Sequence, residues 1–389
     1  MPEIIELGER CCGCGACAAG CGAGAIEMTL DRWGFLHPIV DAVKCIECGR
    51  CGATCPVLLQ GDADGIGTVY WAYADEALQM ESSSGGVFGA LADHVVSAGG
   101  VVYGAAFDGS FREVRHIRVD GQECLSLLRG SKYSQSVMEA ELYRQIATDV
   151  GSGRPVLFSG TACLVAGVRL SLGHLAEAEN LLCADVVCHG VPSAGLYAAY
   201  IDWVRRQKGA DIISVSFRSK RVSWQSYSLE VGFADGTVFS HPYYDDWFMG
   251  AYLNNVSLRG SCFTCPSKGS CGSDLTLGDF WCVSKHYPHL ADVQGVSAVI
   301  VRSEKGRALL GKVRRSLEIG EAEYAHVLQG NPSLEDSAVP NERRDEFLDQ
   351  FASGRPVGDM MTEWRFYRGF TNRLRMRLLH HLRKEAFWT

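Results

Sequence analysis

The sequence predicts an α/β fold (α+β overall), in which a small cysteine-rich N-terminal domain precedes a larger α/β domain and a helical tail. Two dense cysteine runs open the chain, at 11–21 and 45–55. Apolar strand-like segments then alternate with helical ones over 82–221, a pattern typical of parallel βα units. A polar stretch and a basic segment close the chain. We expect boundaries at 1–62, 63–150, 151–325 and 326–389, with the two middle ranges forming one domain.

Composition excludes several classes of protein. The 389 residues are 47% hydrophobic and 21% charged, as in ordinary globular proteins. The net charge of −8 provides no basic field for nucleic acid. The first ten residues lack the basic and apolar regions of a signal peptide, and no apolar run is long enough to span a membrane. We therefore expect a cytoplasmic protein.

The chain has 17 cysteines, and nine of them lie within its first 55 residues. In a reducing compartment, such clustering indicates metal binding or catalysis rather than disulfides. Each opening run follows C-x2-C-x2-C-x3-C, the spacing of bacterial ferredoxins, in which three thiolates hold one [4Fe–4S] cube and the fourth reaches the other. The expected ligands are Cys11, Cys14, Cys17 and Cys55 for one cluster, and Cys45, Cys48, Cys51 and Cys21 for the other.

Zinc is the alternative, but zinc sites use two cysteine pairs rather than two quartets. The small residues inside the runs favour iron–sulfur geometry, because Gly13, Gly15 and Gly49 permit tight turns with positive φ. Cys12 is left over, and we expect it to be a buried bystander.

The larger domain begins with a turn, a helix and a strand. Apolar residues recur at helical spacing from 87 to 96, and 101–107 reads as a buried strand. The preceding Ser82–Gly86 segment provides hydroxyls and free N–H groups where the helix starts. Such a start can bind an anion or be a simple serine cap, and the local pattern does not choose between them.

Two strand–helix segments follow, at 154–172 and 181–207, and 211–221 reads as a third strand. This order predicts a right-handed parallel βαβαβ unit whose ligand crevice lies at the carboxyl ends of the strands. Cys163 and Cys188 come directly after the first two strands, so we expect their thiols to meet at one edge of the sheet. With Cys262 and Cys265, they could hold a third [4Fe–4S] cluster.

Other interpretations of these cysteines remain open. Cys163 and Cys188 could instead be ordinary buried thiols, and Cys262 and Cys265 could form half of a zinc site. Cys271 is a rival fourth ligand. The remaining thiols lie in apolar surroundings and are expected in the core: Cys124, Cys183 and Cys282.

Basic residues mark two further segments. Arg218, Lys220 and Arg221 follow the third strand and could clamp an anion, although a solvated basic loop is the commoner arrangement. Asp279 ends a later strand and lies near the same crevice or in a turn. The segment from Trp364 to Trp388 is a basic amphipathic helix, which could contact a membrane or a partner but more often packs on its own domain.

Seven ordered segments carry a family resemblance. They are "SSSGGVFGALADHVVSAGGVVYGAAFD", "RGSKYSQS", "LFSGTAC", "VCHGVPS", "FRSKRVSW", "CFTC" and "LGDFW". Their order resembles the coenzyme F420 hydrogenase/dehydrogenase beta subunit family, in its bacterial branch, over about residues 5–325.

The resemblance implies an iron–sulfur flavoprotein oxidoreductase that passes single electrons from clusters to FAD. FAD then serves an organic acceptor, either an F420-type deazaflavin or another unsaturated small molecule. The resemblance places the flavin against Ser82, Ser83, Ser84, Gly85, Gly86, Gly130, Ser131, Lys132 and Tyr133, and it supports the third cluster. Lys132, Arg218 and Arg221 are expected to hold phosphates or an anionic substrate.

The resulting hypothesis needs a donor and a proton source. Ferredoxin or another redox partner protein supplies electrons, and we expect an oligomer. His189 is the expected catalytic proton donor, or else a residue that hydrogen-bonds to its neighbours. Two alternatives stay open: a non-catalytic electron-transfer subunit and a zinc-binding structural or regulatory protein.

Overall fold

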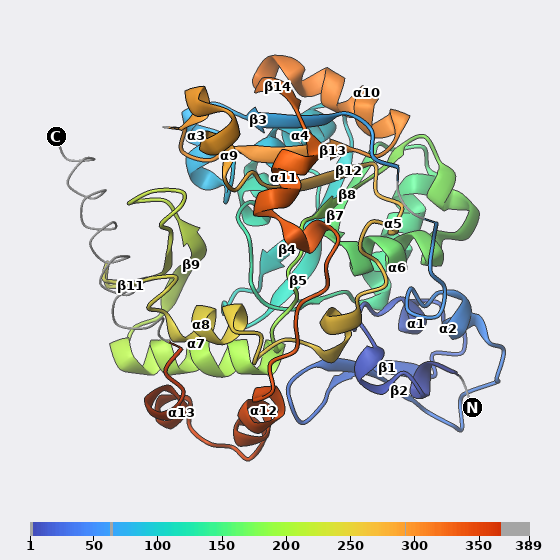
Figure 1. The fold of residues 1–389 in the computed structure, drawn as a ribbon. Helices are drawn as coiled ribbons and strands as arrows, with labels where there is room; N and C mark the ends of the chain where they lie inside the picture. The colour runs from blue at the N-terminus through green and yellow to red at the C-terminus, as the bar shows by residue number, and fades with distance from the viewer. Residues whose placement is uncertain (1–2, 63–64, 292, 367–389) are drawn as a thin grey trace.

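A computed structural model describes residues 3–62, 65–291 and 293–366, and its core is one large mixed sheet (Figure 1). Four strands in the middle of this sheet run parallel, and the pairs on either side of them are antiparallel. In spatial order the nine strands are β14 (Glu318–Ala322), β3 (Val69–Tyr73), β13 (Ser297–Val301), β12 (Leu275–Asp279), β8 (Leu181–Val186), β7 (Val156–Thr161), β4 (Val101–Phe107), β5 (Val114–Val119) and β6 (Ser136–Val137).

Helices cover both faces of the sheet, because successive side chains of a strand point to opposite sides. On β4, Val102 packs with α4 (Val87–Ser97) and α10 (Glu304–Val313). Its neighbours Val101 and Tyr103 pack instead with α5 (Ala140–Gly151) and α6 (Ala162–Leu172). The short helices α3 (Glu76–Glu81), α9 (Val283–His286) and α11 (Tyr324–Gly330) lie near the β3 side (Figure 1).

The N-terminal domain contains a hairpin of β1 (Ile26–Leu30) and β2 (Leu36–Val40), with one-turn helices α1 (Ala16–Ala19) and α2 (Arg50–Ala53). Its small core combines Ile4 and Leu7 with cysteine side chains. Helix α1 packs against α5 and α6, so this domain rests on the helical layer of the large sheet (Figure 1). The ferredoxin-like plan predicted for this region is confirmed.

A third layer shows that the predicted βαβαβ unit is only half right. The β7–α6–β8 part is parallel as predicted, but β9 (Ile212–Ser219) joins a separate antiparallel sheet with β10 (Ser228–Phe233) and β11 (Val238–Pro242). Ile213 of β9 is 60% exposed, whereas a central parallel strand is buried on both faces. Helix α7 (Ala194–Lys208) packs on this second sheet with α8 (Trp247–Leu253).

The helices after residue 340, α12 (Arg344–Ala352) and α13 (Val357–Glu363), complete the α7 layer. Trp364, the first residue of the predicted basic helix, is buried against Phe347 at 5.0 Å between ring centroids. Residues 364–366 are not helical, so the predicted helix does not begin there, and its remaining part, 367–389, lies outside the described residues. Within the described ranges, no helix has the length and apolar character needed to cross a bilayer.

Candidate functional site

The two N-terminal cysteine runs fold into two separate groups of thiols. Cys11, Cys14, Cys17 and Cys55 line one small enclosed cavity, so the last cysteine of the second run joins the first run. Cys51 is buried close to Cys17 and Cys55 and also interacts with Cys21 and Cys45, which are more exposed. Cys48 is exposed to solvent. This exchange of the fourth cysteine is the arrangement expected of a two-cube ferredoxin domain.

Local backbone geometry suits sulfur ligands. Gly13, Gly15 and Gly49 have φ of 69°, 83° and 74°, as the sequence predicts. Backbone N–H groups face the sulfurs, because Gly13 donates to Cys11 Sγ and Ala25 donates to Cys21 Sγ, each at 3.3 Å. Amide donors of this kind stabilise the negative charge of a thiolate-bound cube.

Side chains of the large domain hold the carbonyl groups of the first cysteine loop. Arg259, which is 1% exposed, donates to Cys11 O (2.5 Å) and Leu36 O (2.6 Å). Gln135 donates to the carbonyls of Cys12 and Gly13, and Tyr143 donates to Cys14 O at 2.8 Å. We call these three side chains the carbonyl clamp. All four carbonyls of residues 11–14 are therefore fixed to the large domain.

A β-carbon at Gly13 would lie 2.2 Å from Gln135 Nε2 and 2.9 Å from Arg259 Nη1. Only glycine allows the clamp to approach this loop so closely. The sequence predicts the turn at Gly13, but the clamp itself was not foreseen, because its members are more than 120 residues away along the chain.

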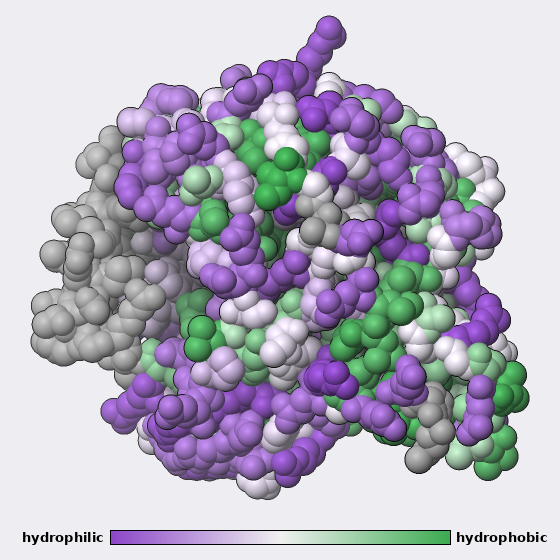
Figure 2. Space-filling view, turned by 45° about the vertical axis from the view of Figure 1, so that its right-hand side comes forward, coloured by the Kyte–Doolittle hydropathy of each residue, from purple (hydrophilic) through white to green (hydrophobic). Residues whose placement is uncertain are grey.

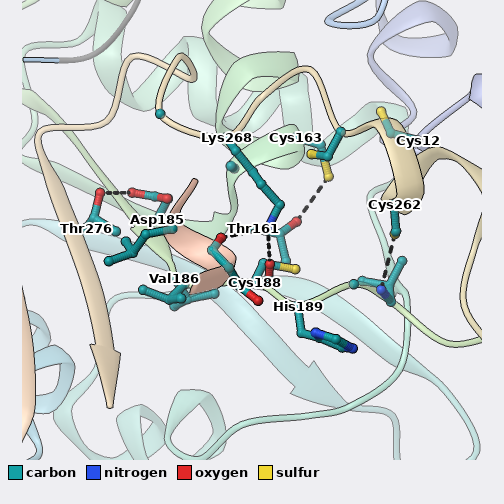
Figure 3. A pocket seen from close by; sticks show the side chains of 18 of the residues that line it. Cys12, Thr161, Cys163, Asp185, Val186, Cys188, His189, Cys262, Lys268 and Thr276 are labelled. Atoms are coloured by element: carbon teal, nitrogen blue, oxygen red, sulfur yellow. Dashed lines mark hydrogen bonds between the residues drawn. The ribbon is translucent and has the colours of Figure 1, made fainter. Parts of the chain in front are cut away.

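A second cavity collects the thiols of the large domain. Cys163 lies in the first turn of α6, Cys188 directly follows β8, and the pairing of β7 with β8 brings them to one edge of the sheet. The cavity is lined by five cysteines, namely Cys12, Cys163, Cys188, Cys262 and Cys265 (Figure 3). We call it the five-thiol cavity.

Polar groups support these sulfurs. The hydroxyl of Thr161 lies 3.3 Å from Cys163 Sγ, and the Val191 amide donates to Cys262 Sγ at 3.4 Å (Figure 3). Lys268 donates to the carbonyl of Cys188. The donor set of soft sulfurs suits an iron–sulfur cube, whose ligands bind separate iron atoms. Across the described ranges, no three His, Cys, Asp or Glu side chains converge closely enough to hold a single metal ion.

The other cysteines are distributed differently. Cys271, the rival ligand, is buried beside the hydroxyl of Ser273 (3.0 Å) and does not line the five-thiol cavity. Cys183 is a core residue and Cys124 is partly buried, as expected. The prediction for Cys282 is wrong, since this residue is exposed at the start of α9 with φ of 64°. Cys12 is buried as expected, but it lines a cavity with four other thiols.

His189 lines the five-thiol cavity. Its Nε2 lies 2.6 Å from Asn255 Oδ1, and its ring meets Tyr252 edge-on at 5.4 Å. Burial lowers the pKa of His189, which the bond to Asn255 partly opposes. Tyr252 in turn packs on Tyr133 at 5.0 Å, so aromatic rings lead from His189 toward the predicted flavin segments.

A third cavity, of about 330 Å³, brings together three segments of the predicted flavin wall. Its lining includes Ser82, Ser83, Gly130, Ser131, Lys132, Arg218 and Arg221. Two of these segments are joined directly, because the Ser131 amide donates to Ser83 Oγ at 2.6 Å. Phe107 and Phe217, with ring centroids 6.4 Å apart, add apolar surface that sequence reasoning missed. We call this the anion cavity.

Four of the predicted flavin-wall residues do not line this cavity. Ser84 donates to Val296 O, and Gly85 donates to Ser297 Oγ. Gly86 caps α4, and the hydroxyl of Tyr133 accepts a hydrogen bond from Arg218 at 3.3 Å. These four residues are therefore not part of the cavity surface.

Two buried arginine N–H groups fit an anionic ligand. Among the described residues, Arg129 Nε and Arg218 Nε have no hydrogen-bond acceptor, and both side chains line the anion cavity. A buried donor without an acceptor is costly, so phosphate or carboxylate oxygens would stabilise this arrangement. The cavity volume is also in the range of small-molecule sites. The residues present therefore fit a flavin nucleotide.

The basic residues around this cavity differ in burial and in their partners. Arg218 makes a bidentate ion pair with Asp279, at 2.9 and 3.0 Å, and lies against the rings of Tyr227 and Trp281. Arg221 is 70% exposed and pairs with Glu230. Burial lowers the pKa of Lys132 to about 7, although its Nζ donates to the carbonyls of Arg129 and Gly130.

Two models of protein families match parts of this chain. A model of the carboxy-terminal part of the coenzyme F420 hydrogenase/dehydrogenase beta subunit matches residues 153–325. A model of the 4Fe–4S dicluster domain matches residues 10–58. Residues 153–325 are thus similar to the carboxy-terminal part of coenzyme F420 hydrogenase/dehydrogenase beta subunits. These matches indicate an iron–sulfur electron-transfer protein of the oxidoreductase class.

One chain among the solved structures also matches this chain. It comes from the F420-reducing [NiFe] hydrogenase complex of Methanosarcina barkeri, in a xenon derivative. The two chains share 14% identity and a TM-score of 0.47, and the match covers 77% of this chain and 94% of that one. No curated protein matches this chain.

Proposed function

We propose that the protein is an iron–sulfur flavoenzyme that moves electrons between a redox partner protein and a small organic acceptor. The observation that carries this proposal is the meeting of three distant segments, around 82, 130 and 218, at the anion cavity. Two of its arginines bring buried N–H groups without acceptors. Phe217, which lines that cavity, packs on Tyr133, and Tyr133 is linked through Tyr252 to His189 of the five-thiol cavity.

The proposed cofactors differ in the number of electrons that they exchange at a time. [4Fe–4S] clusters exchange single electrons, and FAD exchanges electrons singly on one side and as a hydride pair on the other. The N-terminal quartets would hold two clusters, and Cys163, Cys188, Cys262 and Cys265 a third. Ser83, Ser131 and Lys132 would bind and orient the nucleotide, with the free N–H groups of Arg129 and Arg218 facing its phosphates or an anionic substrate.

The exposed side of the N-terminal domain suits a protein donor. Cys48 is exposed, and apolar side chains surround its loop: Val43 is 96% exposed and Ile46 is 72% exposed. Figure 2 shows hydrophobic residues at the lower right of the molecule, on the side where this domain lies. Exposed apolar patches commonly mark protein interaction sites. We therefore assign this surface to ferredoxin or another redox partner protein.

The acceptor is proposed to be an F420-type deazaflavin or another small molecule with an unsaturated bond. Phe107 and Phe217 provide aromatic rings on which a flat ring can stack. The proton-donor role of His189 stays a prediction. Its contact with Asn255 and its place in the five-thiol cavity favour a positioning role instead.

Anaerobic reconstitution followed by counts of iron, sulfide and flavin tests the proposal. We expect about twelve iron atoms and one FAD per chain. Reduced ferredoxin should then support reduction of an F420-type acceptor. Clusters without bound flavin and without turnover would instead identify a non-catalytic electron-transfer subunit. A colourless protein containing zinc would overturn the redox function altogether.

A further inference from the structure

Lys220 connects backbone segments beside the anion cavity. It lines this cavity and is only 2% exposed. Its Nζ donates to three carbonyl groups, those of Gln79 (2.7 Å), Ser84 (2.6 Å) and Gln294 (2.9 Å). An ammonium group has three N–H donors and no acceptor, so these three bonds use its full capacity. Lys220 is therefore a buried connector rather than part of a solvated basic loop.

Two of the three carbonyls belong to the segment 79–84, which we call the serine loop. Its members Ser82 and Ser83 line the anion cavity, between the two carbonyls that Lys220 holds. The carbonyl of Ser83 also accepts a hydrogen bond from Arg218 Nη2, at 3.3 Å. Two basic side chains, from the end of β9 and from the residue directly after it, thus hold the backbone of the serine loop.

The third carbonyl connects Lys220 to the loop before β13. Gln294 lies in this loop next to Gly295, whose φ of 123° is readily adopted by glycine alone. A β-carbon at Gly295 would lie 2.8 Å from Lys220 Nζ and 2.6 Å from Ser84 O. The two loops are therefore in close contact around the ammonium group, which has little room for another position.

The position of the serine loop determines where the anion-binding groups lie. Ser83 Oγ accepts a hydrogen bond from the Ser131 amide, so the loop is joined to the segment that carries Arg129. Arg129 also forms an ion pair with Glu81 of the serine loop. Its Nε is one of the two buried N–H groups of the cavity without an acceptor among the described residues. A displaced serine loop would therefore move both a hydroxyl group and a guanidinium group of the cavity.

We propose that Lys220 is a positioning residue of the anion cavity, which holds the serine loop in the conformation that binds an anionic nucleotide. It acts through the backbone of the loop, because its three donors are already occupied. This inference rests on the proposed function, since the nucleotide is the FAD proposed above.

Lys220→Ala tests this role in cluster-loaded protein from which flavin has been removed. FAD binding is followed by anaerobic calorimetry at about pH 6, because burial lowers the pKa of Lys220 to about 7. We expect the dissociation constant of FAD to rise about ten- to hundredfold, since the serine loop loses hydrogen bonds from a charged donor. Added n-propylammonium supplies the missing side-chain atoms and should restore most of the affinity. 1-Propanol, which has no charge and only one donor, should not.

Lys305→Ala is the matched control. The Nζ of Lys305 also donates to two backbone carbonyls, those of Ala178 and Leu181, but this residue does not line the anion cavity. Its dissociation constant for FAD should equal that of the unmodified protein. Lys220→Met keeps a side chain of similar length without any donor, so it should bind FAD weakly and should not respond to n-propylammonium.

An unchanged dissociation constant in Lys220→Ala would overturn the positioning role, and so would one in Lys220→Met if Lys220→Ala does not fold. Equal rescue by n-propylammonium and 1-propanol would also overturn it, because the side chain would then only fill space. Either result, with FAD bound by the unmodified protein, leaves the proposed function intact. An unmodified protein that binds no FAD would overturn both the proposed flavin and the role of Lys220.

Discussion

Cys163 lines the five-thiol cavity and is an expected ligand of the third cluster. Its replacement should therefore lower the metal content of the protein. Cys163→Ser should lower iron by about four atoms per chain, because an alcohol is a poor replacement for a thiolate ligand. Cys271→Ser is the control, since Cys271 is buried beside Ser273 outside the five-thiol cavity. Equal iron in both variants and in the unmodified protein would contradict the third cluster. Iron and sulfide assays decide the matter.

Arg218 and Arg221 belong to the same basic segment, yet we expect their ion pairs to contribute differently to the free energy of unfolding. The Arg218 side chain is 3% exposed and its ion pair with Asp279 is enclosed by rings, so Asp279→Asn leaves a buried charge uncompensated. We expect a loss of about 3–5 kcal/mol in the free energy of unfolding.

Glu230→Gln removes the charged partner of Arg221, whose side chain is 70% exposed. We expect this change to lower the free energy of unfolding by less than about 1 kcal/mol. Urea denaturation of the two variants measures the difference. Similar losses in both would show that enclosure by Tyr227 and Trp281 does not strengthen the Arg218 pair.

Lys132 should make anion binding depend on pH. Burial lowers its pKa to about 7, so the ammonium group is charged below that pH and neutral above it. The dissociation constant of an anionic nucleotide should therefore rise with pH, by up to about tenfold per unit above about 7. Lys132→Met should bind FAD more weakly at low pH and show a flatter profile. Fluorescence titration of flavin-free protein with FAD, from about pH 6 to about pH 8, tests this.

At the scale of elements, the contact between α7 and the N-terminal domain depends on two glycines. The amide of Gly195 donates to Gly34 O at 3.1 Å, and a β-carbon at Gly195 would lie 2.9 Å from the Cα of Gly34. Gly195→Ala must push the two backbones apart, at a cost of about 1–3 kcal/mol. Gly311 in α10 has open space at its β-carbon position, so Gly311→Ala should stabilise by about 0.5–1 kcal/mol. Thermal unfolding should show opposite shifts of the melting temperature.

Elements with local signals were predictable. The strand at 101–107 and the helix after Gly86 agree with β4 and α4, because apolar spacing and the glycine pair at 99–100 define them locally. The segment 211–221 is a strand as predicted, but its partner strand was not predictable, because the apolar residues of β9 would also suit a buried central strand. The exposure of Ile213, which reveals the second sheet, is a tertiary property.

The site was predictable to a similar degree. Cysteine spacing indicates which thiols share a group, since these contacts lie within one motif or at the ends of adjacent strands. The carbonyl clamp and the position of Cys12 were not predictable, because Arg259 and Cys11 are 248 residues apart and no motif relates them. Cys282 was misjudged because its apolar neighbours in sequence, Trp281 and Val283, pack inward while Cys282 itself points out.

For the whole molecule, the proposed direction of electron flow starts at the exposed face of the N-terminal domain. Val43→Glu with Ile46→Glu should slow reduction of the clusters by a protein donor, because the apolar contact surface is lost. Reduction by dithionite, which needs no docking surface, should be unchanged. Ile213→Glu is the control, as Ile213 is 60% exposed on a different sheet. Stopped-flow absorbance follows both reactions, and equal slowing by all variants would contradict a specific docking face.

The carbonyl clamp has a consequence for biogenesis. The loop from Cys11 to Cys14 is sealed by Arg259, Gln135 and Tyr143, so its inorganic core must be installed before the two domains close on each other. Cys48, in contrast, is exposed to solvent while the two domains are in contact. We therefore expect oxygen damage to begin at a cube bound by Cys48, whereas a cube bound by the buried thiols of Cys11, Cys14, Cys17 and Cys55 should last longer.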